Sequence, residues 1–170
     1  DEVQKKIFYT ALYHTMIAPA LYNDADGSYR GTDKKVYANA KFNNYTIFSL
    51  WDTYRTLNPF LAIIQPERTA DFINSMLAIY KQQGKLPIWH LQANETDCMV
   101  GYSAVPIIAD AYLNGIGGFD PLLALEAMKA SSTRDDLGMK YIKEKGYIPA
   151  DMEVESVSKA MEYAISDWCI

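Results

Sequence analysis

The sequence predicts an all-α fold in which the helices pair as antiparallel hairpins. Apolar residues recur at helical spacing along most of the 170 residues. Glycine and proline fall where these periodic segments begin or end, as helix boundaries require. Only one stretch, around residues 28–29 and 36–37, favours strands, in the form of a short hairpin. Long helices joined by loops of varied length are typical of helical hairpins packed side by side.

Three helices are predicted in the first half of the chain. They cover residues 2–17, residues 46–56 and a segment that begins at Pro66 and ends at Gly84. The first carries an apolar stripe formed by Val3, Ile7, Phe8, Ala11, Leu12 and Met16. Residues 22–44 are rich in Asp, Asn and Gly and predict a loop around the short hairpin. Asn58-Pro59 marks a break or restart, because the residue before a proline disfavours helical geometry. Proline is favoured at the first helical position and glycine just after the last one.

Four further helices are predicted in the second half. Residues 86–101 lack clean periodicity and are predicted to be a loop that leads into a helix over residues 103–114. Asp120 as N-cap and Pro121 at the first position begin the next helix. Its inward residues are expected to be Leu122, Leu125 and Met128. A short helix is expected over residues 137–145 and a last one from Glu153. The last helix carries an apolar stripe at 3.6-residue spacing, namely Val154, Val157, Met161, Ala164, Ile165 and Trp168.

Composition excludes several functional classes. The chain has 49% hydrophobic residues, enough for one domain with a core. Its net charge is −5, and no basic face suits a nucleic acid, so a nucleic-acid partner is excluded. The apolar runs are too short for a membrane-spanning segment. The first residues lack the cationic start and apolar centre of a signal peptide. For Cys98 and Cys169 the sequence favours two free buried thiols over a disulfide.

The two ends of the chain predict a fragment of a longer protein. A helix begins at residue 2, and the last helix ends in the apolar run Trp168-Cys169-Ile170 without a glycine, a proline or a polar turn. Natural termini usually fray into polar residues. Such a fragment exposes apolar surface that its missing part would cover, so we expect self-association.

Metal signatures in the sequence are weak. The stretch DADGSYRG opens like a calcium loop, but Lys35 stands where position twelve requires a glutamate, so an Asp/Gly turn is the better interpretation. His14 and His90 are the only histidines, and neither has the spacing of a zinc ligand. A ligand role for His90 stays open. A Cys98–His90 nucleophile pair lacks an orienting signature.

Two polar segments stand out as candidate chemistry. Asp52 and Arg55 lie three residues apart inside the apolar stretch SLWDTYRTLNPF, either as a local salt bridge or as charges pointing into a polar cavity. The segment HLQANETDCM carries several acids and amides, which suit either a helix N-terminus or a site. Asp52 and Glu95 together could supply the two carboxylates of glycoside hydrolysis.

Taken together, longer runs of this sequence resemble a known family. The runs are YNDADGSYRG, FSLWDTYRTLNP, the stretch from QPERTADF through LPIWHLQANETDCMVGYSAVPIIADAYLNGI, GYIPAD and VSKAMEYAISDWCI. In this order and spacing they resemble the catalytic domain of family 92 glycoside hydrolases, which are bacterial exo-acting α-mannosidases. WDTYR and NETDCMVGY carry most of the resemblance, which covers practically the whole chain.

The resemblance implies a calcium-dependent, inverting α-mannosidase with a β-sandwich domain followed by an (α/α)6 barrel. The chain, residues 1–170, would then be about half of that barrel, without the sandwich domain. The family segments that carry the catalytic acid, Y-T-E-G-N-x-W-Q, and the base, G-N-x-D-x-G-Q-M-S, do not occur in this sequence. No catalytic residue and few calcium ligands are therefore expected here, and the chain alone should be inactive. The expected partner is a mannose-terminated glycan, and the expected location is periplasmic, secreted or at the cell surface.

By the same resemblance, five residues are expected to contact or face the terminal sugar. They are Asp52, Arg55, Trp89, Asn94 and Glu95. The first two match WDTYR, and the others lie in or beside the NET segment. The resemblance removes Asp52 and Glu95 from consideration as the acid–base pair. A non-catalytic carbohydrate-binding module and a structural helical domain remain as alternatives.

Overall fold

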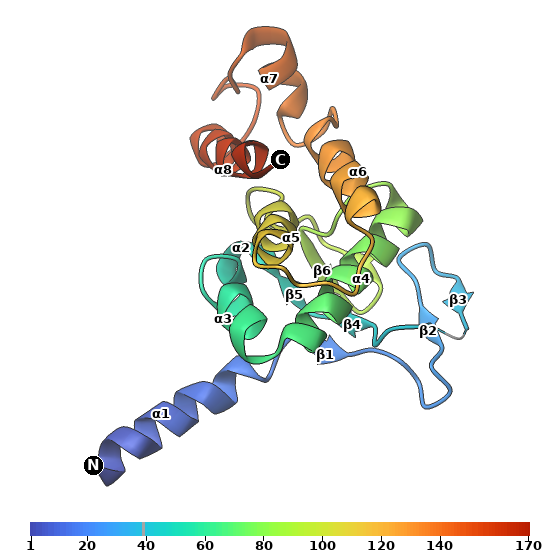
Figure 1. Cartoon of the computed structure of the whole chain (residues 1–170). Coiled ribbons are helices and arrows are strands. Elements are labelled where there is room, and N and C mark those ends of the chain that lie inside the picture. The colour runs from blue at the N-terminus through green and yellow to red at the C-terminus, as the bar shows by residue number, and fades with distance from the viewer. Residues whose placement is uncertain (39) are drawn as a thin grey trace.

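The structure is a computed structural model that describes residues 1–38 and 40–170. Within these residues the chain forms the following eight α-helices: α1 (Glu2–Thr15), α2 (Leu50–Thr53), α3 (Leu57–Ile64), α4 (Pro66–Gln83), α5 (Ala104–Leu113), α6 (Pro121–Ser132), α7 (Met139–Lys145) and α8 (Ser156–Cys169). In Figure 1, α3, α4 and α5 gather in the body of the molecule, α1 extends away from it, and α7 lies at the opposite end.

Short strands accompany the helices. They are β1 (Ala20–Leu21), β2 (Tyr29–Arg30), β3 (Val36–Tyr37), β4 (Tyr45–Thr46), β5 (Phe48–Ser49), β6 (Trp89–Leu91) and β7 (Asn94–Glu95). Antiparallel pairing joins them into three sheets, β1–β4, β2–β3 and β5–β6–β7. The β2–β3 pair confirms the short predicted hairpin, with Tyr29 opposite Tyr37.

The all-α prediction, and with it the description as half of a purely helical barrel, is wrong. About 51% of the chain is helical and 9% is strand, so the sheets are part of the fold. The segment from residue 46, predicted as helix, first forms β4 and β5 and becomes helical only at Leu50. Ile47 separates these two strands with a φ of 64°. That left-handed conformation is unfavourable for a β-branched residue and interrupts any helix. The predicted loop at 86–101 contains the β6–β7 hairpin.

The core lies around α4. Its buried face includes Phe72, Ile73, Met76 and Leu77, which are at most 3% exposed. Packing pairs α3 with α4 and α5, and α5 with α6 and α8. The predicted boundaries of α4 are confirmed, since Pro66 occupies its first turn and Gly84 caps its end at a φ of 80°. The predicted N-cap of α6 is confirmed too, because the Asp120 carboxylate accepts the first free N–H groups.

Two predicted apolar stripes face outward. No residue of α1 is buried, and Val3, Ile7 and Phe8 of its stripe are 67%, 65% and 61% exposed, whereas Leu12 and Met16 are half-buried. In α8 the stripe residues Val157, Met161 and Trp168 are 75%, 66% and 87% exposed. The buried face of α8 is instead formed by Ser156, Lys159, Tyr163 and Ser166. Leu122 of α6, also expected inside, is 78% exposed. Periodicity identifies a stripe but not the element that covers it.

None of the helices in the described part of the chain is long and apolar enough to cross a membrane.

Candidate functional site

The β5–β6–β7 sheet brings the two polar segments together. Ser49, the last residue of β5, lies opposite Trp89 of β6. The chain passes from Ser49 directly into α2, which carries Asp52. On the other side, β6 pairs with β7, which holds Asn94 and Glu95. Segments about forty residues apart in the sequence therefore meet at one small sheet.

Asp52 is exposed and keeps most of its carboxylate accessible. The hydroxyl of Ser49 donates a hydrogen bond to its Oδ2 atom. Among the described residues, Asp52 takes part in no ion pair, so the local salt bridge to Arg55, one of the two interpretations of the sequence, does not form. Next to it, the indole N–H of Trp51 is buried and has no hydrogen-bond partner within residues 1–38 and 40–170. A buried donor of this kind is normally satisfied by another protein group, an ordered water or a ligand.

Arg55 is paired with a residue far along the chain. Its guanidinium forms an ion pair with Glu162 of α8 and donates to the backbone oxygen of Trp51 at 3.3 Å. It also lies over the ring of Tyr54, 4.3 Å from the centroid. The Tyr54 hydroxyl donates to the other oxygen of Glu162 at 2.9 Å. Burial, followed by the hydrogen bond to the Glu162 carboxylate, raises the pKa of Tyr54 to about 12.

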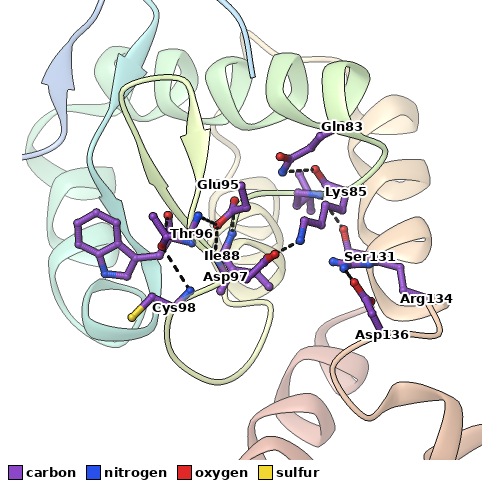
Figure 2. A network of polar contacts seen from close by, with 12 residues as sticks. Gln83, Lys85, Ile88, Glu95, Thr96, Asp97, Cys98, Ser131, Arg134 and Asp136 are labelled. Atoms are coloured by element: carbon purple, nitrogen blue, oxygen red, sulfur yellow. Dashed lines mark hydrogen bonds and ion pairs between the residues drawn. The ribbon is translucent and has the colours of Figure 1, made fainter. Parts of the chain in front are cut away.

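Glu95 organises the backbone of the hairpin. Its Oε2 atom accepts the N–H of Ile88 at 3.0 Å. Its Oε1 atom accepts the N–H groups of Trp89, Thr96 and Asp97 at 2.8, 3.1 and 3.1 Å. Figure 2 shows this carboxylate at the centre of the loop. Because four donors already use its lone pairs, Glu95 is poorly suited to act as a base toward water.

The hairpin is fixed on both sides by lysines that the sequence interpretation did not single out. Lys34 donates to Oδ1 of Asn94 at 2.6 Å and to the backbone oxygen of Ala93 at 2.5 Å. Lys85 forms an ion pair with Asp97, as Figure 2 shows. The loop before the hairpin is also tied to α6, because Leu86 donates its N–H to the Ser131 hydroxyl at 3.0 Å. Trp89 itself is half-buried, and Asn94 is exposed.

His90 is a buried structural residue of β6, 3% exposed. Its ring nitrogens lie 3.2 Å from the Thr46 hydroxyl and 3.5 Å from that of Thr32. Burial lowers the pKa of His90 to about 4, so the ring is neutral near pH 7. Both cysteines are free, as expected, but Cys98 is exposed rather than buried.

The acidic side chains that the structure describes do not form a calcium site by themselves. Within the described ranges, no group of three or more His, Cys, Asp or Glu side chains is arranged to hold a metal. In the DADG stretch, the exposed carboxylate of Asp26 accepts the N–H of Ser28, as in an ordinary turn. Hydrogen bonding from the Ser28 side chain, followed by that from its backbone N–H, lowers the pKa of Asp26. No step of the chemistry is therefore assigned to a metal held by these residues.

Solved structures of similar sequence are glycoside hydrolases. The family GH92 α-mannosidase BT3965 from Bacteroides thetaiotaomicron is 46% identical, with a TM-score of 0.94 over 98% of this chain and 23% of its own. It has also been solved in complex with mannoimidazole. The family GH92 inverting mannosidase BT2199 from Bacteroides thetaiotaomicron VPI-5482 is 32% identical, with a TM-score of 0.83 over 95% of this chain and 23% of its own.

A curated relative is more distant. An uncharacterized secreted glycosidase from Arthroderma benhamiae is 25% identical over 187 residues, which cover 100% of this chain and 20% of that protein. The chain thus spans less than a quarter of the length of these relatives.

The family itself is matched along the entire sequence. The glycosyl hydrolase family 92 catalytic domain aligns with residues 1–170. WDTYR and NETDCMVGY carry most of the resemblance. WDTYR begins two residues after β5, and NETDCMVGY begins with β7 of the same sheet, with β6 between these two strands. The chain therefore belongs to glycosyl hydrolase family 92, as a part of its catalytic domain.

Proposed function

We propose that the protein containing this chain is an exo-acting α-mannosidase that removes terminal α-linked mannose from glycans with inversion. The observation that carries the proposal is that one small sheet connects the two segments: β5 leads into WDTYR with the exposed Asp52 carboxylate, and β7 holds Asn94 and Glu95 of the NET segment. Two solved relatives are mannosidases, which supports the choice of sugar.

In this proposal the chain supplies part of the sugar-binding surface. Asp52 accepts hydrogen bonds from hydroxyl groups of the terminal mannose, because only one of its oxygens is engaged, by Ser49. Arg55, 48% exposed, donates from its remaining N–H groups. Trp89 offers an aromatic face and Asn94 an exposed amide. Glu95 contributes by holding the hairpin that carries them.

The bond cleavage itself is assigned to other parts of the protein. Inversion requires a carboxylic acid at the leaving oxygen and a carboxylate base for water. The family segments for these two groups are absent from this sequence, and Glu95 is engaged by four backbone donors. Calcium, which the family resemblance implies, would bind mainly through residues outside this chain. We accordingly propose that the isolated chain is inactive.

We also propose that the protein acts outside the cytoplasm, as a secreted, periplasmic or cell-surface enzyme. The name of the secreted fungal relative supports this location.

For the isolated chain we propose self-association through the exposed apolar stripes of α1 and α8. Analytical sedimentation of the chain at increasing concentration tests this self-association, and a monomer at all concentrations would contradict it.

The experiment on function uses the full-length protein and the isolated chain in parallel. Full-length protein should release mannose from an α-mannoside, and the chain should release none above buffer. In full-length Asp52→Asn we expect kcat/KM to fall on the order of tenfold to a hundredfold, the effect of losing a charged hydrogen bond. The melting temperature should stay unchanged. Asp151→Asn, the same change at an exposed position, is the control.

Three results would contradict the proposal. Mannose release by the isolated chain would place the catalytic groups within it. Heat on mixing the chain with mannose, without turnover in the full-length protein, would favour a binding module. A lowered melting temperature in Asp52→Asn with unchanged turnover would favour a structural domain.

A further inference from the structure

Glu162 lies where three segments of the chain meet. It belongs to α8, and its side chain is 12% exposed. One of its carboxylate oxygens accepts the Tyr54 hydroxyl, and the other pairs with the guanidinium of Arg55. Both partners belong to the WDTYR segment, more than a hundred residues earlier in the sequence.

The other side of Glu162 is held by the end of the NETDCMVGY segment. Gly101 has a φ of 90°, and a Cβ atom placed on it would lie 3.1 Å from the Cβ of Glu162. The backbone at Gly101 therefore approaches the stem of Glu162 more closely than most side chains allow. The next residue, Tyr102, donates its hydroxyl to Asp167, five residues after Glu162 in α8. The two contacts fix α8 against this segment, so Glu162 has little freedom to move.

The position of Arg55 decides what Asp52 can do. The two residues are three apart, a spacing at which an arginine and an aspartate readily pair. An ion pair between them would occupy the carboxylate that faces the site. In the structure Arg55 pairs with Glu162 instead, and within residues 1–38 and 40–170 the Asp52 carboxylate has the Ser49 hydroxyl as its one side-chain partner.

We propose that Glu162 is a positioning residue that keeps Arg55 away from Asp52 and so leaves the Asp52 carboxylate free for the sugar. The proposal rests on the function proposed above and adds to it a residue that acts without touching the substrate. It also assigns a reason for the stacking of Arg55 on Tyr54, because both side chains are held by the same carboxylate.

The test is a double-mutant cycle in the full-length protein. Glu162→Gln keeps the size and one hydrogen-bond acceptor but removes the charge that holds Arg55. We expect KM for an α-mannoside to rise about tenfold or more, the effect of roughly one charged contact, with kcat within about threefold. In an Arg55→Gln background, Glu162→Gln should have no further effect, because its partner is gone. Glu144→Gln, an exposed glutamate on α7, is the control and should match wild type.

Crystal structures of wild-type and Glu162→Gln protein supply a second readout. In the variant, the Arg55 guanidinium should lie within about 4 Å of an Asp52 oxygen, the limit for an ion pair. If Glu162→Gln fails to fold, Glu162→Asp keeps the charge and shortens the side chain by one methylene. Glu162→Asp should also raise KM and bring Arg55 closer to Asp52, both to a smaller degree.

The outcomes separate the two proposals. A Glu162→Gln effect that persists undiminished in the Arg55→Gln background overturns the positioning role and leaves the mannosidase proposal intact. An inactive wild-type protein overturns the mannosidase proposal. In that case the Arg55–Asp52 distance in the variant still decides whether Glu162 holds the two side chains apart, and an unchanged Arg55 position overturns the inference.

Discussion

Replacing Glu95 by glutamine should destabilise the chain far more than its partial exposure suggests. The carboxylate accepts four backbone N–H groups, three of them on one oxygen. In Glu95→Gln, one oxygen becomes a nitrogen that donates only. The least costly orientation keeps the remaining oxygen toward Trp89, Thr96 and Asp97. The new amide nitrogen then faces the N–H of Ile88, donor against donor.

The magnitude follows from these contacts. One charge-assisted hydrogen bond is lost, at about 1.5 to 3 kcal/mol, and the other three become neutral and about half as strong. Thr96 and Asp97 are exposed, so water replaces part of what is lost there. We expect the free energy of unfolding to fall by about 2 to 4 kcal/mol in total.

Urea unfolding of the isolated chain, followed by circular dichroism, measures the effect. With an m-value of about 2 kcal/mol/M for a chain of this size, the midpoint should move by about 1 to 2 M. Hydrogen exchange at Ile88 and Trp89 should accelerate with it, because these amides lose their acceptor. Glu144→Gln makes the same chemical change at an exposed site and should leave the midpoint in place. A Glu95→Gln midpoint equal to that of Glu144→Gln would refute the structural role given to this carboxylate.

Two further predictions concern the core and the buried histidine. Ile73 is fully buried, so Ile73→Ala should lower the free energy of unfolding by about 2 to 5 kcal/mol. Ile63→Ala, at an 81% exposed position, should change it by less than about 0.5 kcal/mol, and equal effects would contradict the assignment of the core. Burial lowers the pKa of His90 from 6.5 to about 4, so the unfolded chain takes up a proton before the folded one does. The contribution of His90 to the free energy of unfolding is greatest above pH 6.5. It should fall, by at most about 3 kcal/mol, as the pH drops from 6.5 to about 4. Urea midpoints across this range should fall less steeply in His90→Gln than in wild type. In the control variant His14→Gln, the urea midpoint should depend on pH as steeply as in wild type. The same steepness in His90→Gln would contradict the buried, neutral His90 ring.

Local chemistry made several helix boundaries predictable. Pro66 and Gly84 mark the ends of α4, and Asp120 with Pro121 marks the start of α6. In each case a single residue type satisfies a backbone requirement within its own turn. Such requirements do not depend on the rest of the fold, so the sequence alone reveals them.

The β5–β6–β7 sheet was missed because its signals are absent from the sequence. The β6–β7 hairpin turns through Gln92 and Ala93, both at positive φ. Turns of this kind usually carry asparagine or glycine, so Gln92 and Ala93 give no sign of a turn in the sequence. Strands of two or three residues are also too short for a period of two to be recognised.

The candidate site was predictable in part for a similar reason. The family resemblance selected Asp52 and Arg55, and their spacing suggested that they pair with each other. The partner of Arg55 is instead Glu162, 107 residues away. A contact of that separation leaves no local pattern, and in the sequence Glu162 resembles any surface glutamate of a helix.

The length of α4 constrains the candidate site, because α4 lies in the sequence between Asp52 and the β6–β7 hairpin. After α2, the chain returns to β6 through the 18 residues of α4, about 27 Å of helix. Substitutions on the exposed side of α4 leave that distance unchanged. One inserted or deleted residue would instead turn everything after it by about 100° and shift it by about 1.5 Å. Ser49 would then no longer lie opposite Trp89, so natural length variation should spare α4 and accumulate in the loop of residues 22–28.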